Sequence, residues 1–117
     1  MLRPVLAALV ATESQVETVS LEAIIEVGLH KECMRGRDGY GSGIRPNHWL
    51  PGRSYTFIGQ IDFLDRDWLK PGDSCEARLG FIVPKQDVEK FIPGFSWHIC
   101  EVNRIVGYCS IKAISSN

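Results

Sequence analysis

The chain has 117 residues, of which 44% are apolar and 23% are charged, a length that fits one domain with a core needing no disulfide or metal. The net charge of −1 gives the whole chain no general attraction for nucleic acid or an anionic membrane. No apolar run approaches the roughly 20 residues of a transmembrane helix, so we expect no membrane association.

Residues 1–18 precede the regular pattern and are predicted to form an N-terminal extension. The run from Met1 to Ala11 contains one positive charge, Arg3, followed by apolar and small residues. That pattern is faintly similar to a signal peptide, but the apolar run is at the lower limit for one. We favour a structured element here, either a strand or a short helix.

A β-strand pattern begins at Val19. Apolar residues then occupy alternate positions: Leu21, Ala23, Ile25, Val27 and Leu29. Glu22 and Glu26 alternate against them, which is the period of a half-buried strand. β-branched residues and Gly28 make a helix the poorer interpretation.

Residues 30–46 are predicted to form a long loop. Four glycines between positions 36 and 43 argue against any regular element in this segment. A loop of this length inside a small domain is usually functional or mobile, so residues 30–46 are the first place to look for a working surface.

The rest of the chain reads as short strands divided by turns. Strands are expected over residues 47–50, 54–63, 75–83, 95–101 and 104–114, with a possible helical turn over 85–90. Pro51-Gly52 and Pro71-Gly72-Asp73 have the residues that tight turns favour. About six evenly spaced strands indicate a sandwich or a barrel, and residues 19–117 contain no sign of a second domain.

Four short motifs, in order, resemble the third domain of elongation factor Tu and related translational GTPases. Gly43-Ile44-Arg45-Pro46 is similar to a Gly-aromatic-Arg-Pro motif that follows the first long loop of that domain, and Pro71-Gly72-Asp73 is similar to its turn. The segments Gly94–Glu101 and Arg104–Ile111 resemble two of its strands. The resemblance implies an all-β fold, a six-stranded antiparallel closed β-barrel.

The resemblance also suggests where a partner would bind. The matching loop of the family helps to grip the T-stem of aminoacyl-tRNA through an arginine, and Arg35 or Arg37 falls nearby in this chain. Arg104 matches a second arginine on the tRNA side. No G-x-x-x-x-G-K-[ST] motif is present, so we expect no GTP binding.

The candidate binding residues are Arg35, Arg37, Tyr40, Arg45, His48, Trp49 and Arg104. Arginine matches phosphate groups in a bidentate manner, and tyrosine can stack on a base. His48 beside Trp49 offers a second place for a partner to stack. Three interpretations of the glycine loop remain open: a solvated loop, an RNA-binding surface and a protein-binding surface. The weak charge argues against tight RNA binding.

No catalytic constellation emerges from the sequence. The three histidines lie at no metal-ligand spacing, and no triad or paired carboxylates are found. His30 with Cys33 is the nearest approach to a base and a nucleophile, and we interpret both as loop residues. No C-x-x-C pair occurs, so we expect reduced thiols, a cytoplasmic location and no cofactor.

The sequence therefore favours a non-catalytic binding module over an enzyme. The first hypothesis is a protein-interaction module, either a mimic of a translation factor or a toxin-neutralising protein of the immunity type. The alternative is a tRNA- or RNA-binding translation accessory protein that uses Arg35, Arg37, Arg45 and Arg104.

Overall fold

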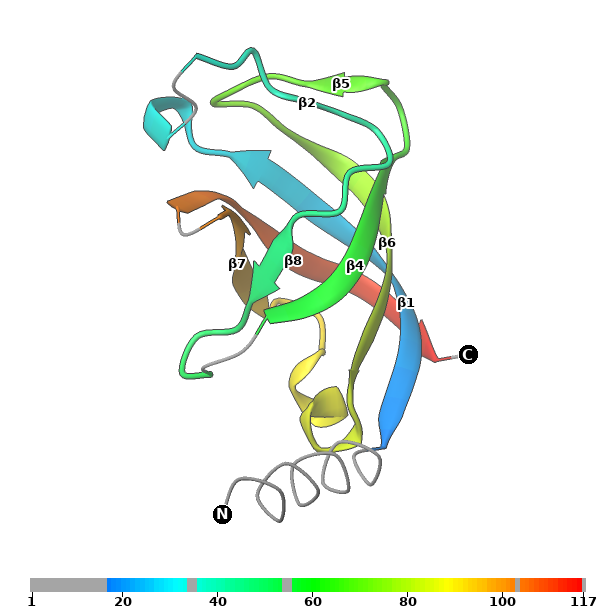
Figure 1. The fold of residues 1–117 in the computed structure, drawn as a ribbon. Helices are drawn as coiled ribbons and strands as arrows, with labels where there is room; N and C mark the ends of the chain where they lie inside the picture. Colours follow the sequence, from blue (N-terminus) through cyan, green and yellow to red (C-terminus); the bar gives the residue numbers. More distant parts are fainter. Residues whose placement is uncertain (1–16, 34–35, 54–55, 103, 117) are drawn as a thin grey trace, which may run out of the picture.

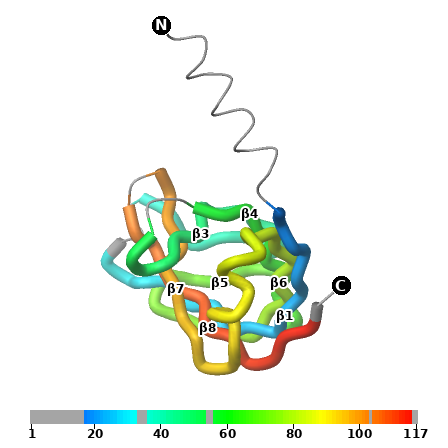
Figure 2. Tube along the Cα trace, turned by 90° about the horizontal axis from the view of Figure 1, so that it is seen from below, coloured from blue at the N-terminus to red at the C-terminus, as the bar shows by residue number. Residues whose placement is uncertain are grey.

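Six antiparallel strands close into a β-barrel in the order β1-β6-β4-β3-β7-β8, as the computed structural model of the chain shows (Figure 1). The structure describes residues 17–33, 36–53, 56–102 and 104–116. Viewed from below, the strands surround a common interior (Figure 2). The prediction of an all-β, six-stranded antiparallel closed barrel is confirmed.

The elements follow one another with short connections. The barrel strands are β1 (Thr18–Leu29), β3 (Asn47–Trp49), β4 (Thr56–Phe63), β6 (Ser74–Pro84), β7 (Ser96–Glu101) and β8 (Arg104–Ser116). Outside the barrel wall lie β2 (Tyr40–Gly41), β5 (Trp68–Leu69) and two 3₁₀ helices, η1 (Lys31–Cys33) and η2 (Lys85–Lys90). The expected helical turn over residues 85–90 is therefore present as η2.

The alternating pattern of the sequence directs side chains into the barrel. Along β1, residues Leu21, Ala23, Ile25, Val27 and Leu29 are all buried, as their spacing predicts. Aromatic rings fill part of the interior, where Phe57, Phe81, Phe91 and Trp97 lie with ring centroids 5.0–6.3 Å apart. Such tilted and edge-on contacts add to the stabilisation from apolar burial.

Closure of the barrel depends on a close approach between β1 and β8. Gly107 of β8 pairs with Leu29 of β1, and a Cβ atom at Gly107 would lie 2.1 Å from the Gly28 carbonyl oxygen. Only glycine tolerates that distance. Gly107 is thus a point of close backbone approach between β1 and β8.

The loop over residues 30–46 is more regular than its glycines suggest, and the expectation of no regular element was wrong at two places. η1 forms at its start, and β2 pairs with β5 through Tyr40–Leu69 and Gly41–Trp68. Gly39 allows this pairing for two reasons. Its φ is 120°, and a Cβ atom at this position would lie only 1.9 Å from the Leu69 carbonyl oxygen, so a side chain would clash with β5. Glycine here makes the pairing possible.

The N-terminal extension over residues 1–18 falls almost wholly outside the described residues, and β1 begins at Thr18. None of the helices in the described ranges is long and apolar enough to cross a membrane.

Among the side chains that the structure describes, Cys75, Cys100 and Cys109 carry free thiols, and their burial differs. Cys109 is fully buried and Cys75 nearly so, whereas Cys100 is half-buried. Burial raises the pKa of the Cys109 thiol far above its ordinary value and raises that of Cys75 and Cys100 as well. Since the thiolate is the nucleophile, these cysteines are weak nucleophiles in the folded protein.

We expect alkylation of the native protein at neutral pH to modify Cys100 slowly and to leave Cys109 unmodified until the protein unfolds. Peptide mass spectrometry after timed iodoacetamide treatment measures both rates, with a urea-unfolded sample as the control. Equal rates at Cys100 and Cys109 in the native sample would contradict the burial of Cys109.

Candidate functional site

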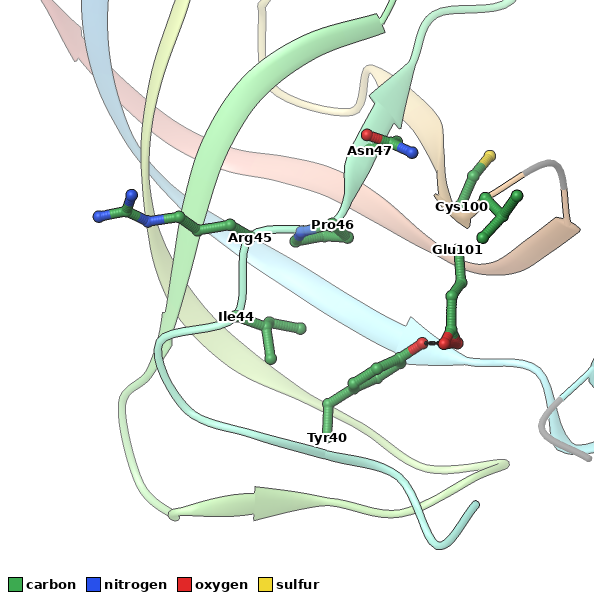
Figure 3. A pocket seen from close by; sticks show the side chains of 8 residues that line it. Tyr40, Ile44, Arg45, Pro46, Asn47, Cys100 and Glu101 are labelled. Carbon is green, nitrogen blue, oxygen red and sulfur yellow. Dashed lines mark hydrogen bonds between the residues drawn. The ribbon is translucent and has the colours of Figure 1, made fainter. Parts of the chain in front are cut away.

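A pocket of about 290 Å³ opens between the loop after β2 and the β7–β8 hairpin (Figure 3). Its lining is formed by Tyr40, Ile44, Arg45, Pro46, Asn47, Cys100, Glu101 and Val102. The volume lies at the lower end of those that hold small ligands, and it suits one side chain of a partner. Two predicted site residues, Tyr40 and Arg45, meet here.

The carboxylate of Glu101 joins the two walls of this pocket. The Tyr40 hydroxyl donates a hydrogen bond to Glu101 Oε2 at 2.6 Å (Figure 3), and Arg37 Nη2 lies 2.7 Å from Glu101 Oε1. The Arg37 guanidinium also sits 5.5 Å from the centroid of the Tyr40 ring, within the range of a cation–π contact. These contacts hold the β2 loop against the β7–β8 hairpin, 61 positions away in sequence.

A tyrosine phenol is protonated at neutral pH even at its ordinary pKa, and the same contacts make that of Tyr40 still harder to ionise. Burial, the hydrogen bond to Glu101 and the negative charge of Glu101 raise the pKa of Tyr40 to about 12, and the Arg37 charge opposes them. Tyr40 is therefore a fixed hydrogen-bond donor at neutral pH, and the charge of Glu101 is balanced within the pocket.

Glu101→Gln is expected to lower the pKa of Tyr40 toward its ordinary value, with the part due to burial remaining. The reason is that the amide removes both the negative charge and the stronger acceptor. An NMR titration of the Tyr40 ring signals, assigned by comparison with Tyr40→Phe, measures the change. An unaltered Tyr40 pKa in Glu101→Gln would show that Glu101 does not hold the phenol.

The apolar side of the pocket is formed by Ile44, Pro46 and Val102. Val102 is 83% exposed and has a φ of 59°, in a region that β-branched residues rarely occupy. Such strain costs about 1–3 kcal/mol and is concentrated at functional sites. Val102 follows Glu101, which pairs with Arg104 across the hairpin, so its positive φ belongs to a two-residue hairpin turn. The turn presents an exposed apolar side chain at the mouth of the pocket, where a partner could contact it.

The segment before β3 is held in place by β4. Ile61 donates its backbone N–H to the Ile44 carbonyl at 2.9 Å, and Gly43 donates to the Ile61 carbonyl at 2.8 Å. Arg45 then donates from Nε to Gln60 Oε1 at 3.0 Å. Figure 3 shows its guanidinium pointing away from Tyr40 and Glu101, so only the base of Arg45 lines the pocket.

An aromatic row runs over the outer wall beside the pocket. Trp49 of β3, His98 of β7 and Tyr108 of β8 are cross-strand neighbours, and the Trp49 and His98 rings stack with centroids 5.5 Å apart. Trp49 Nε1 donates to the Arg53 carbonyl at 2.7 Å, and the Tyr108 hydroxyl donates to Glu26 at 2.5 Å. All three rings are half-buried, so part of each remains open to a partner.

His48 was wrongly predicted as a stacking residue, because its ring lies in the core with 0% exposure. Trp97 Nε1 donates to His48 Nδ1 at 3.0 Å, and His48 Nε2 lies 3.1 Å from the Gly59 carbonyl. An indole N–H only donates and a carbonyl only accepts, so the proton is on Nε2. Burial lowers the pKa of His48 to about 4, and the ring is neutral at pH 7.

The remaining predicted residues are spread out. Arg104 begins β8 directly opposite Glu101 and is exposed, while Arg35 lies outside the described residues. Sequence reasoning missed Glu101 and Val102. The sequence predicts the two strands that flank the β7–β8 turn. It does not predict that Glu101 contacts the 30–46 loop, because residues so far apart in the chain leave no local sequence pattern.

No group of three or more His, Cys, Asp or Glu side chains within the described ranges is arranged to hold a metal ion. The chain matches no protein-family model and no curated protein.

Proposed function

We propose that this chain is a non-catalytic protein-binding module whose partner occupies the pocket beside Tyr40, Glu101 and Val102. The observation that carries the proposal is the exposed Val102, with its positive φ, at the mouth of a pocket whose two walls are joined by the Tyr40–Glu101 bond. An apolar group of the partner would fill the space between Val102, Pro46 and Ile44.

The chemistry of the surrounding surface supports this proposal. Tryptophan, tyrosine and arginine are the residues that most often dominate binding energy at protein interfaces. Here Trp49 and Tyr108 flank the pocket from the aromatic row, and Arg37 and Tyr40 lie on its other wall. Half-buried rings lose little side-chain freedom when a partner covers them.

The charges favour a protein over RNA. Arg37 pairs with Glu101, and the Arg45 guanidinium turns away from the pocket, so neither is free to neutralise a phosphate there. The chain has a net charge of −1, whereas tight RNA binding requires several unpaired cations.

The motifs over residues 43–111 that resemble a translation-factor barrel support a more specific role. We propose a mimic of such a factor, or a toxin-neutralising protein of the immunity type, acting in the cytoplasm. Free thiols at Cys75, Cys100 and Cys109 are in keeping with a reducing compartment.

Affinity capture from cytoplasmic extract of the native host, with and without nuclease, tests the proposal. We expect one protein to be recovered in near-equal amount with the bait, and nuclease to leave the yield unchanged. Recovery of RNA alone, or of no specific protein, would overturn it.

The alternative, tRNA binding, is favoured by the exposure of Arg45 and Arg104. If it holds, Arg104→Ala should weaken tRNA binding and reduce the slope of log K against log salt by about 1, since one phosphate contact is lost. Fluorescence titration with tRNA at several salt concentrations measures this. No binding at low salt would exclude the alternative.

A further inference from the structure

The outer wall of β4 and β6 carries an exposed apolar pair, three residues along β4 from Ile61, where Ile44 of the pocket lining bridges to this strand. Ile58 is 72% exposed and Ile82 is 45% exposed. They are direct cross-strand partners, and their side chains lie on the same outer face, since successive residues of a strand alternate between faces. Figure 1 shows the two strands side by side along the wall.

The surroundings of this pair differ from the rest of the wall. Elsewhere β1, β6 and β8 carry opposite charges in contact, with Glu22 3.5 Å from Arg78 and Glu76 2.8 Å from Lys112. The outward-facing residues next to the pair on β4 and β6, and the residue opposite Ile82 on β1, are uncharged: Thr56, Gln60, Gly80, Pro84 and Ser20. Charges begin one step further out, at Glu22, which pairs with Gly80, and at Arg45, which bonds to Gln60. Gly80 leaves open space beside the pair. The Ile58–Ile82 patch is therefore a shallow apolar surface framed by charges.

The N-terminal segment joins the barrel beside this patch. The backbone N–H of Lys85 donates to the Glu17 carbonyl at 2.9 Å, and their side chains are 3.5 Å apart. Thr18 pairs with Pro84, and Ser20 pairs with Ile82 itself. Residues 1–16 thus connect to the fold three positions before the residue that faces Ile82.

The sequence of that segment is complementary to the patch. Its large apolar residues are Met1, Leu2, Val5, Leu6, Leu9, Val10 and Val16, and those from Leu2 to Val10 follow the i, i+3, i+4, i+7 and i+8 spacing of an amphipathic segment. Arg3 is its one charge before Glu13. Leu9 is eight positions from Glu17, and a chain reaches at most roughly 3.3 Å per residue. That reach exceeds the roughly 10 Å that three strand residues put between Lys85, which bonds to Glu17, and Ile82.

We propose that residues 1–16 dock on the Ile58–Ile82 patch of their own chain, with Leu6 and Leu9 in contact with the two isoleucines. The docked segment covers the apolar surface that the barrel wall leaves exposed and protects it from association with other chains. The pocket beside Val102 takes no part, so this inference is independent of the proposed function.

Isoleucine-methyl NMR of the full chain tests the docking directly. We expect the Leu6→Lys, Leu9→Lys double variant to move the methyl signals of Ile58 and Ile82, while those of Ile61 and Ile99, which are 0% exposed in the core, stay in place. Unchanged signals of Ile58 and Ile82 would overturn the proposal. If the Ile58 and Ile82 signals instead shift with protein concentration and are the same in the double variant, the patch binds a second copy of the chain, and the docking proposal is also overturned.

Thermal unfolding supplies an independent measurement. Leu6→Lys and Ile82→Lys should each lower the Tm by about 4 °C, and the combined variant should lose clearly less than the sum, because both remove one contact. Ile92→Lys, at another exposed isoleucine (58% exposed), is the matched control and should add fully to Leu6→Lys. Full additivity of Leu6→Lys with Ile82→Lys would contradict docking.

Discussion

Replacing Gly107 by alanine is expected to lower the free energy of unfolding by roughly 3 kcal/mol. The added Cβ would lie 2.1 Å from the Gly28 carbonyl oxygen and 3.3 Å from a methyl of Ile99. Backbone atoms cannot move aside as a flexible side chain can, so β1 and β8 must separate where they close the barrel.

Gly80→Ala is the matched control, because a Cβ at Gly80 meets nothing within 4 Å. Alanine there should leave stability unchanged or raise it slightly, since it restricts the unfolded chain. Urea unfolding followed by tryptophan fluorescence measures both variants. Equal stability of Gly107→Ala and Gly80→Ala would show that β1 and β8 do not approach as closely as described.

The second large effect is acid destabilisation through His48. The pKa of the folded state is about 4 and the ordinary value is 6.5, so between these values the unfolded chain binds a proton that the folded protein refuses. Stability is fully present above pH 6.5 and falls as the pH decreases toward 4. The total contribution is roughly 3 kcal/mol, at about 1.4 kcal/mol per pKa unit.

His48→Gln separates this effect from the titration of carboxylates. The variant is expected to be less stable at pH 7, because Gln must replace the ring that accepts from Trp97 Nε1 and donates to Gly59. Its stability should vary less between pH 6.5 and 4, because no group titrates at this position. Urea midpoints of the parent protein and of His48→Gln at several pH values measure how steeply the stability of each falls with pH. The same dependence on pH in both proteins would mean that His48 is not the buried neutral base.

Local chemistry was enough to predict an all-β fold of short strands, either a sandwich or a barrel, and the resemblance to a known family implied the closed barrel. The alternation over Leu21–Leu29 and the turn residues at Pro71-Gly72-Asp73 are patterns of neighbouring residues in the sequence. The structure has a strand over the first segment and a turn at the second. Gly107 was also recognisable, since a glycine within an otherwise apolar strand marks a close approach.

The site could be predicted only in part, because it depends on contacts between distant positions. Tyr40 was singled out for its aromatic ring, but its partner Glu101 lies on a strand with no local feature that sets it apart. Asp87 shows the same limit. It stands in the polar helical turn predicted over residues 85–90, and its sequence neighbours do not reveal that it is 0% exposed and lies 2.5 Å from Arg53 Nη2.

His48 failed for a different reason. A strand of three residues, Asn47–Trp49, is too short for its period to show which face is buried. Histidine and tryptophan side by side were both taken as accessible, whereas alternation places one inside and one outside.

Binding of the captured protein to matched variants tests the central claim most directly. Val102→Asp places a charge at the mouth of the pocket. Ile92→Ser is the control, because Ile92 is also an exposed apolar residue but lies before β7, whereas Val102 lies after it. Measured by calorimetry on variants of unchanged Tm, affinity should fall at least about tenfold, or 1.4 kcal/mol, for Val102→Asp and stay unchanged for Ile92→Ser. Unchanged affinity for Val102→Asp would contradict the assignment of this pocket as the binding site.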